Sequence, residues 1–169
     1  MNPSNRLLLA VDDSQVSGLV VGYVAKLFAQ RRDVDVYICH VHVVDTLLPE
    51  GLAFAIGEIE AARRIAQAEQ EAEVLWKREA EQAAQPIFLH AREVLRQAKI
   101  PDQAVFTLAC LTTRKRDIAA EIIEQARAYE CSTVVVGRAS FSWLREYFEH
   151  HVADELVRQG RGLTIWIVE

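Results

Sequence analysis

The strongest structural signal in the chain is Leu7-Leu8-Leu9-Ala10-Val11-Asp12-Asp13-Ser14. Five apolar residues are followed at once by two carboxylates and a hydroxyl. An apolar run of this length, without polar alternation, is typical of a strand that is buried on both faces of a parallel sheet. Ser14 stands where a helix N-cap is expected. The stretch therefore predicts a buried strand, a turn and a helix.

Strand and helix patterns alternate along the rest of the chain. Apolar residues at Val20, Val24 and Leu27 recur at helical spacing, which predicts a helix from Val16 to about Arg31. The later patterns predict helices at Asp117–Tyr129 and Trp143–Arg158, and strands at Val34–Val44, Ala104–Leu111, Ser132–Val136 and Leu163–Val168. We therefore expect an α/β fold with a five-stranded parallel sheet and helices on both of its faces.

The segment from about 52 to 99 is rich in Ala, Glu, Gln and Arg, and this composition favours helix. Pro86 interrupts the segment, and a proline inside a helix costs about 3 kcal/mol. The sequence therefore predicts a break or kink near Gln85 and a second helix from about Pro86 to Gln97. Charges of both signs alternate along the first part, as on a solvated or partner-facing helix. A protein partner that binds this long helical segment is one prediction.

Composition limits the classes of protein to which the chain can belong. Its 169 residues, 51% of them hydrophobic, are enough for one domain over residues 1–169 with a substantial core. The net charge of -5 argues against binding to nucleic acid or to an anionic membrane. The apolar runs are too short for a signal peptide or a membrane span. Three cysteines without metal-like spacing predict reduced, buried thiols, so we expect a cytoplasmic protein.

Motifs of common enzymes and cofactor sites are missing from the sequence. The chain has no GxGxxG, GxxxxGK[ST], GxSxG or HExxH. Ligands of doubly wound sheets bind beyond the carboxyl ends of the strands. Asp12, Asp13, His42, Thr112 and Gly137 stand at such positions. We therefore expect a binding site among the residues at the strand ends.

The order of these residues resembles the universal stress protein family over nearly the whole chain. Leu8–Ser14 is similar to the first strand and turn of the family, and His42-Val43-Val44-Asp45 to the end of its second strand. Ser132–Gly137, a loop, a helix and Leu163–Val168 complete the resemblance. The resemblance implies an adenine-nucleotide-hydrolase-like sheet with the strand order 3-2-1-4-5.

In nucleotide-binding members of the family, the first-strand aspartate, here Asp12, contacts ribose or base, and main chain after a strand-two histidine contacts adenine. The matching residue is Val43 if His42 is that histidine, or Val41 if it is His40. The resemblance places the phosphates on a loop of pattern G-x2-G-x9-G-[ST], whose four positions fall on Gly137, Ser140, His150 and His151. The nucleotide-site residues that it implies are Ala10, Val11, Asp12, Val43, Gly137, Arg138, Ser140, His150, His151 and Val152.

Only the first of the four loop positions keeps its glycine, in a chain that has just 7 glycines. Glycine lets backbone N–H groups approach a phosphate without a Cβ in the way, whereas His150 adds bulk there. We therefore expect weak or no ATP binding. In the alternative, Arg138 and the run Arg114-Lys115-Arg116 bind the phosphates, with His150 and His151 protonated, and weak hydrolysis follows. The same arginines and lysine are also consistent with a basic patch that is exposed to solvent and binds no ligand.

Two residue pairs have both a chemical and a structural interpretation. His40 and His42 project from one face of a strand, as metal ligands or as structural histidines, and we expect the structural role. Asp12 and Asp13 are adjacent carboxylates, but no nucleophile stands beside them. We expect ligand contact by Asp12 or a capping role for Asp13, and we assign no catalytic or metal-binding residue.

The last strand contains no Lys or Pro that would protect a free sheet edge. The family resemblance implies a homodimer through this strand, with Leu163, Thr164, Ile165, Trp166, Ile167 and Val168 at the interface. Trp166 is either an interface anchor or a core residue under the last helix. The function that we expect is a stress-response or regulatory binding module and not an enzyme. No cofactor is certain, and the candidate ligand is ATP or another adenine nucleotide.

Overall fold

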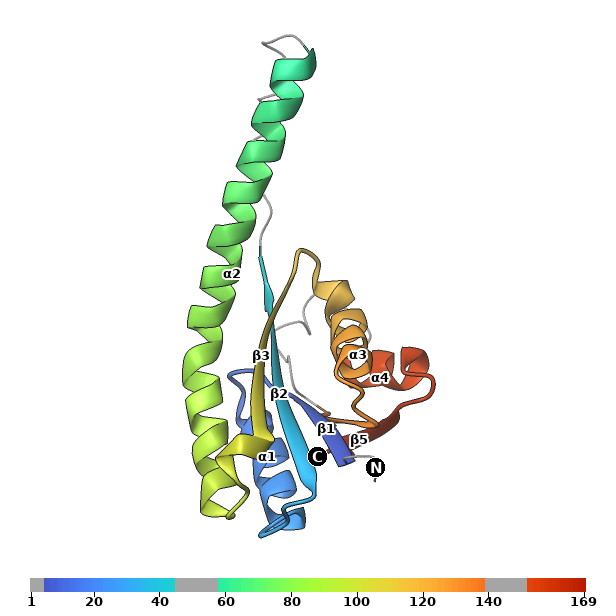
Figure 1. Cartoon of the computed structure of the whole chain (residues 1–169). Helices are drawn as coiled ribbons and strands as arrows, with labels where there is room; N and C mark the ends of the chain where they lie inside the picture. The colour runs from blue at the N-terminus through green and yellow to red at the C-terminus, as the bar shows by residue number, and fades with distance from the viewer. Residues whose placement is uncertain (1–4, 45–57, 139–151) are drawn as a thin grey trace.

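The computed structural model describes residues 5–44, 58–138 and 152–169. It contains strands β1 (Asn5–Ala10), β2 (Val34–Val43), β3 (Val105–Thr112), β4 (Thr133–Gly137) and β5 (Thr164–Val168), and helices α1 (Gln15–Leu27), α2 (Glu58–Gln97), α3 (Ile118–Ala128) and α4 (Val152–Gln159). The strands are parallel and lie in the order β3-β2-β1-β4-β5 (Figure 1). The expected fold class and strand order are therefore confirmed, while a single domain over residues 1–169 stays a prediction.

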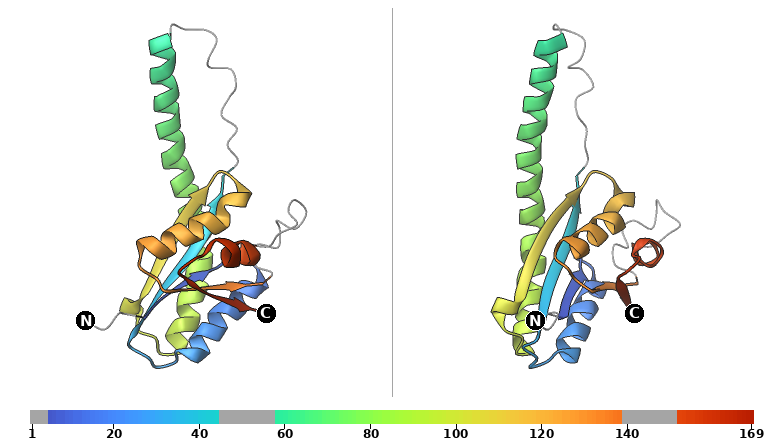
Figure 2. Two further views of the ribbon diagram at one scale, coloured as in Figure 1. Left: turned by 90° about the vertical axis from the view of Figure 1, so that its right-hand side faces the viewer. Right: turned by 45° about the vertical axis from the view of Figure 1, so that its right-hand side comes forward.

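β1 is the central strand, and its side chains alternate between two apolar cores. Leu8 and Ala10 pack toward α3 and α4, whereas Leu7, Leu9 and Val11 pack toward α1 and α2. All five residues are at most 4% exposed. The two pairs of helices cover opposite faces of the sheet (Figure 2). The unbroken apolar run of the sequence is thus explained by burial on both sides of one strand.

α1 begins as expected and ends earlier than expected. Ser14 is the N-cap, and its hydroxyl accepts a hydrogen bond from the Ser17 N–H at 3.4 Å. The helix ends at Leu27 and not near Arg31. Gln30 has a φ of 64°, in the left-handed region, and its N–H donates to the Ala98 carbonyl at 3.0 Å. This link to the chain just beyond α2 turns the backbone out of the helical path.

α2 is one continuous helix (Figure 1), so the predicted break near Gln85 and the separate helix beginning at Pro86 are wrong. Pro86 lies in the interior of the helix. Pro86 removes one helical hydrogen bond, at a cost of about 3 kcal/mol. The buried side chains of Phe88 and Leu95 anchor the part of the helix that follows it. Burial of each such side chain is worth about 1.5–3 kcal/mol, so packing on the sheet outweighs the proline.

The amino-terminal part of α2 extends well past the sheet (Figures 1 and 2). Val74 and Leu75 are exposed there, and Lys77 forms an i,i+4 ion pair with Glu73 at 2.5 Å. In the described ranges, no helix combines the length and the apolar character that crossing a bilayer requires.

The carboxyl-terminal elements agree with the sequence pattern where they are described. α4 covers Val152–Gln159, while the preceding part of the expected helix, from Trp143, falls outside the described residues. Gly160 follows the helix directly, and a Cβ on it would lie 2.6 Å from the Leu156 carbonyl oxygen. Gly162 has a φ of +84°, which favours glycine. The two glycines thus allow the tight turn from α4 into β5.

β5 is an edge strand, and Trp166 does not lie under the last helix. Its ring stacks on Phe28 with centroids 6.3 Å apart and meets the edge of Tyr23 at 6.4 Å. Trp166 therefore packs on the α1 side of the sheet and stays half-buried.

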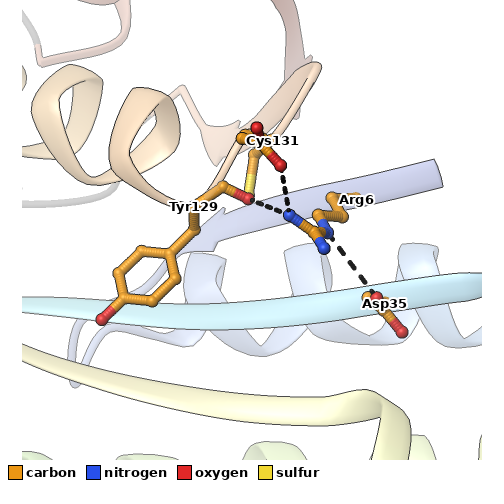
Figure 3. Close-up of polar contacts among 5 residues, drawn as sticks. Arg6, Asp35, Tyr129 and Cys131 are labelled. Atoms are coloured by element: carbon orange, nitrogen blue, oxygen red, sulfur yellow. Dashed lines mark hydrogen bonds and ion pairs between the residues drawn. The ribbon is translucent and has the colours of Figure 1, made fainter. Parts of the chain in front are cut away.

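Arg6, near the amino end of β1, connects this strand to β2 and to the segment between α3 and β4 (Figure 3). Its Nη1 donates to the Tyr129 carbonyl at 3.1 Å and to the Glu130 carboxylate at 2.9 Å, and its Nε lies 3.8 Å from Asp35. Burial raises the pKa of the nearby Cys131 thiol to about 11. All three cysteines are free and buried, as the sequence predicted.

The continuity of α2 leads to a stability prediction. Pro86→Ala restores a helical N–H and removes the ring from a helix that is already formed, so it should raise the free energy of unfolding. We expect a gain of about 1–2 kcal/mol, smaller than the full proline penalty because alanine also makes the unfolded chain more flexible. Urea unfolding measures the gain, with Gln85→Ala as the exposed neighbouring control. An unchanged or lower stability of Pro86→Ala would contradict this account.

Candidate functional site

The turn between β1 and α1 is organised around the buried carboxylate of Asp12. Its Oδ1 accepts hydrogen bonds from the Ser14 N–H at 3.1 Å, from the Ser14 hydroxyl at 2.5 Å and from the Ser17 hydroxyl at 2.5 Å. The Asp12 N–H in turn donates to the Ser17 hydroxyl at 2.8 Å. Asp13 is exposed, and Ser14 occupies the N-cap position, so the proposed capping role of Asp13 is wrong.

His40 connects the end of β2 to the same turn. Its Nδ1 lies 3.0 Å from the Val11 carbonyl oxygen. A carbonyl can only accept, so Nδ1 carries the proton and donates, which leaves Nε2 of the neutral ring as an acceptor. Burial lowers the pKa of His40, and the neighbouring His42 lowers it further, against the Val11 hydrogen bond that raises it. His40 is therefore a neutral imidazole that holds the β1–α1 turn against β2.

A cavity of about 280 Å³ lies beside these two elements. It is bounded by the β1–α1 turn, by the end of β2 and by one face of α2; its lining residues are Asp12, Asp13, His40, Val41, His42, Val43, Ala83 and Ile87. We call this cavity the crevice. It has carboxylate and imidazole groups on one wall and apolar side chains on the other. Such a mixture suits a flat polar ring that needs both stacking surface and hydrogen-bond partners.

The structure brings together part of the expected ligand site. Asp12 and Val43 both line the crevice, as does Val41 of the alternative register. Ala10, at the end of β1, is fully buried, and Val11 lies directly before Asp12 with its carbonyl bonded to His40. The expectation that the ends of β1 and β2 meet at one site is consistent with this arrangement.

Arg138 follows β4 but turns away from the crevice. Its N–H donates to the Val168 carbonyl at 2.9 Å, and its guanidinium forms an ion pair with the Glu169 carboxylate. The side chain is therefore engaged at the end of β5. Gly137, the retained glycine, is the buried last residue of β4.

The two arginines of the basic run after β3 do not line the crevice either. Arg114 is exposed, and its N–H donates to the Thr112 hydroxyl at 3.4 Å. Arg116 lies 3.8 Å from the carboxylate of its neighbour Asp117. This local pairing agrees with the interpretation of the run as a solvated basic patch.

Val152 is an expected site residue that the structure describes, and it does not line the crevice. Val152 is buried at the start of α4, against the α3 side of the sheet. Ser140, His150 and His151 lie outside the described residues. Among the side chains that the structure does describe, no three His, Cys, Asp or Glu residues are arranged to hold a metal ion.

Three residues of this site were missed by sequence reasoning. Ser17 binds the Asp12 carboxylate, and its only signal is its place three residues after Ser14. Ala83 and Ile87 belong to the α2 wall, and the expected helix break at Pro86 hid their position on one face of a continuous helix.

Comparison with known proteins identifies the family. A profile of the Universal stress protein family matches residues 3–161. The chain belongs to this family. No individually curated protein sequence gives a significant match.

Several solved structures share the fold of this universal stress protein at low sequence identity. A family member from Burkholderia pseudomallei is 16% identical, with a TM-score of 0.58 over 99% of this chain and 98% of the other. A universal stress protein in complex with cAMP is 13% identical, with a TM-score of 0.61 over 98% and 97% of the two chains. The universal stress protein from Archaeoglobus fulgidus in complex with dAMP is 13% identical, with a TM-score of 0.56 over 97% of each chain.

The position of His40 leads to a prediction about acid stability. Its pKa in the folded protein lies below the ordinary value of 6.5, so the unfolded chain binds a proton first as the pH falls. The contribution of His40 to stability is therefore complete above about pH 6.5 and declines below it. His40→Asn keeps a donor for Val11 without a titrating ring and should reduce this decline, as measured by urea unfolding between pH 7 and pH 5. His90→Asn, at an exposed position, should keep the decline; an equal effect of both variants would contradict the role of His40.

Proposed function

We propose that this universal stress protein is a regulatory binding module of the stress response that holds an adenine nucleoside group in the crevice and binds ATP weakly or not at all. The observation that carries the proposal concerns the phosphate end. Of the four loop positions only Gly137 is a glycine, and Arg138, the nearest substitute for the missing glycines, is paired with Glu169. A polyphosphate therefore has few binding groups among the described residues.

The base and ribose end of the proposed site has more support. Asp12, His40 and Val43 border one cavity, and a carboxylate and an imidazole nitrogen offer hydrogen-bond acceptors to the hydroxyl groups of a ribose or the amino group of adenine. Two of the structural neighbours were solved in complex with cAMP and with dAMP. Each of these ligands is an adenine nucleotide with one phosphate, so a site that depends on base and ribose suits this ligand class.

The alternative, an ATP-binding protein with weak hydrolytic activity, depends on Arg138 and on the run from Arg114 to Arg116. Arg138 is paired with Glu169, and Arg116 with Asp117. The alternative therefore requires both ion pairs to open, and we place it second.

Titration calorimetry with adenosine, AMP, cAMP and ATP tests the proposal. We expect no increase in affinity from AMP to ATP, because the added phosphates gain few partners, and an ATP Kd weaker than roughly 100 μM, equivalent to about 5–6 kcal/mol. Asp12→Ala should weaken the binding of every ligand that binds the wild type, because all of them share the nucleoside. Arg138→Ala should leave all affinities unchanged.

The opposite pattern would decide for the alternative. Micromolar ATP affinity that is lost in both Asp12→Ala and Arg138→Ala would overturn the proposal. Circular dichroism of each variant confirms that it is folded, which matters for Asp12 because its carboxylate also holds the β1–α1 turn.

We also propose that two copies of the chain pair through β5. In β5, the Thr164 N–H and the Val168 carbonyl bond toward β4. Backbone groups alternate in direction along a strand, so those of Ile165 and Ile167 point out of the sheet edge. An antiparallel pairing that uses both residues sets Ile165 opposite Ile167 of the other copy, and the two Trp166 residues face each other across the twofold axis.

The surface beside this edge is apolar, which supports the pairing. On the α1 face, Leu19, Tyr23 and Leu27 recur at helical spacing and are 45–56% exposed. Tyr23 and Trp166 also line a hollow of about 460 Å³ along the edge. Contiguous exposed apolar side chains are typical of protein interfaces.

Cysteine cross-linking tests this register. Directly opposed residues in a non-hydrogen-bonded antiparallel pair have Cα atoms about 4.5 Å apart, within the range of a disulfide. Trp166→Cys should therefore form a covalent dimer under mild oxidation, as seen by non-reducing electrophoresis. Thr164→Cys, two residues away on the same strand, should stay monomeric on the gel. Equal cross-linking of the two variants would exclude the proposed pairing. It would also be excluded if neither variant cross-links and the wild type is monomeric in light scattering.

Binding of a protein partner to the long helical segment stays a prediction. Its support is the extension of α2 past the sheet and the exposure of Val74 and Leu75 on that part of the helix.

A further inference from the structure

A groove of about 500 Å³ separates the first turns of α1 from the middle of α2. It adjoins the crevice, with which it shares Asp12, Asp13 and Ile87. Its lining residues are Val11, Asp12, Asp13, Ser14, Gln15, Ser17, Gly18, Val21, Pro86, Ile87, His90 and Ala91. Its size falls within the range of pockets that bind small molecules. We call this cavity the α1–α2 groove.

Gly18 keeps the α1–α2 groove open. A Cβ added to this glycine would meet no atom within 4 Å, so the helix presents free space at this point. Gly22, one turn further along α1, also has free space around a Cβ position but does not line the groove. A glycine inside a helix lowers its stability by about 1 kcal/mol relative to alanine. The two glycines therefore form a matched pair, of which only Gly18 borders the groove.

Pro86, which lines the groove, leaves one carbonyl of α2 without its helical donor. In an α-helix the carbonyl of residue 82 accepts a hydrogen bond from the N–H of residue 86, but Pro86 has no N–H. The missing donor lies on the helix face of Pro86, which borders the α1–α2 groove. The Gln82 carbonyl, one helical turn before Pro86, therefore has no N–H donor within the helix.

The charge of the groove favours a cation. Asp13 is an exposed carboxylate on its rim, and none of its described lining residues is Lys or Arg. The start of α1 would normally attract an anion. Here the Asp12 carboxylate and the Ser14 hydroxyl already accept from the first turn, so an additional anion would face two carboxylates.

We propose that the α1–α2 groove is a second ligand site, which binds a small protonated amine attached to an apolar ring. The ring lies between Val21 and Ile87 in the space left by Gly18. The ammonium group donates to the Asp13 carboxylate and to the Gln82 carbonyl. This ligand site does not rest on the proposed nucleotide function: Asp13 and Ile87 border both cavities, but Gly18, Val21 and Pro86 line only the groove.

NMR titration of the full chain with 2-phenylethylamine as the probe tests the proposal. We expect saturable shifts confined to the amides of residues 13–22 and 82–91, and no saturable shifts with 3-phenylpropanoate, which has a similar ring but the opposite charge. Gly18→Leu fills the groove and should weaken binding at least about tenfold, whereas Gly22→Leu should leave it unchanged. Asp13→Asn should weaken binding roughly tenfold or more, since a hydrogen bond to a charged group is lost.

Pro86→Ala separates a ligand role from a structural one. It restores the helical donor to the Gln82 carbonyl, so it should weaken amine binding several-fold in a protein that is at least as stable as the wild type. The proposal is overturned if the amine causes no saturable shift, if the acid binds equally well, or if Gly18→Leu and Gly22→Leu behave alike. None of these results depends on ATP or AMP binding in the crevice.

Discussion

β1 lies at the centre of the sheet, between β2 and β4, with a helical layer on each face. The backbone of such a strand pairs with a neighbouring strand on each side, and the side chains of its buried part must be apolar. The run Leu7–Val11 meets this requirement with side chains that are at most 4% exposed. The order of the other strands, the separation of the helices into two layers and the position of the carboxyl-terminal edge all follow from this central strand.

Directly after β1, the apolar core ends and a polar network begins at the β1–α1 turn. The chain must leave the core at once, and Asp12 makes the turn by accepting hydrogen bonds from Ser14 and Ser17. His40 supports the same turn from β2 through the Val11 carbonyl. One small network therefore supports the turn that borders both the crevice and the α1–α2 groove. A buried carboxylate in such a network has a structural role, whatever ligand it contacts.

The sequence predicted local features well where one strong preference acted alone. The apolar run of β1, the Ser14 cap and the edge position of the last strand are all seen in the structure. The sequence-based prediction was wrong where the local preference of a residue opposed its packing in the fold. Pro86 disfavours helix, but Phe88 and Leu95 are buried against the sheet, and this long-range burial keeps α2 continuous. Likewise, Trp166 has no sequence signal for either face of the sheet, and its stacking on Phe28 is decided by the position of α1.

The sequence by itself determined the α/β class, the parallel sheet, the strand-end location of the candidate site and the loss of three of the four loop residues of a nucleotide-binding relative. These features depend on residue type and spacing along the chain. Only the tertiary structure decided that α2 supplies a wall of the crevice, that Arg138 pairs with Glu169, and that Gly18 and Pro86 border one groove. These features depend on contacts between residues far apart in sequence, and such contacts form only when the helices pack on the sheet.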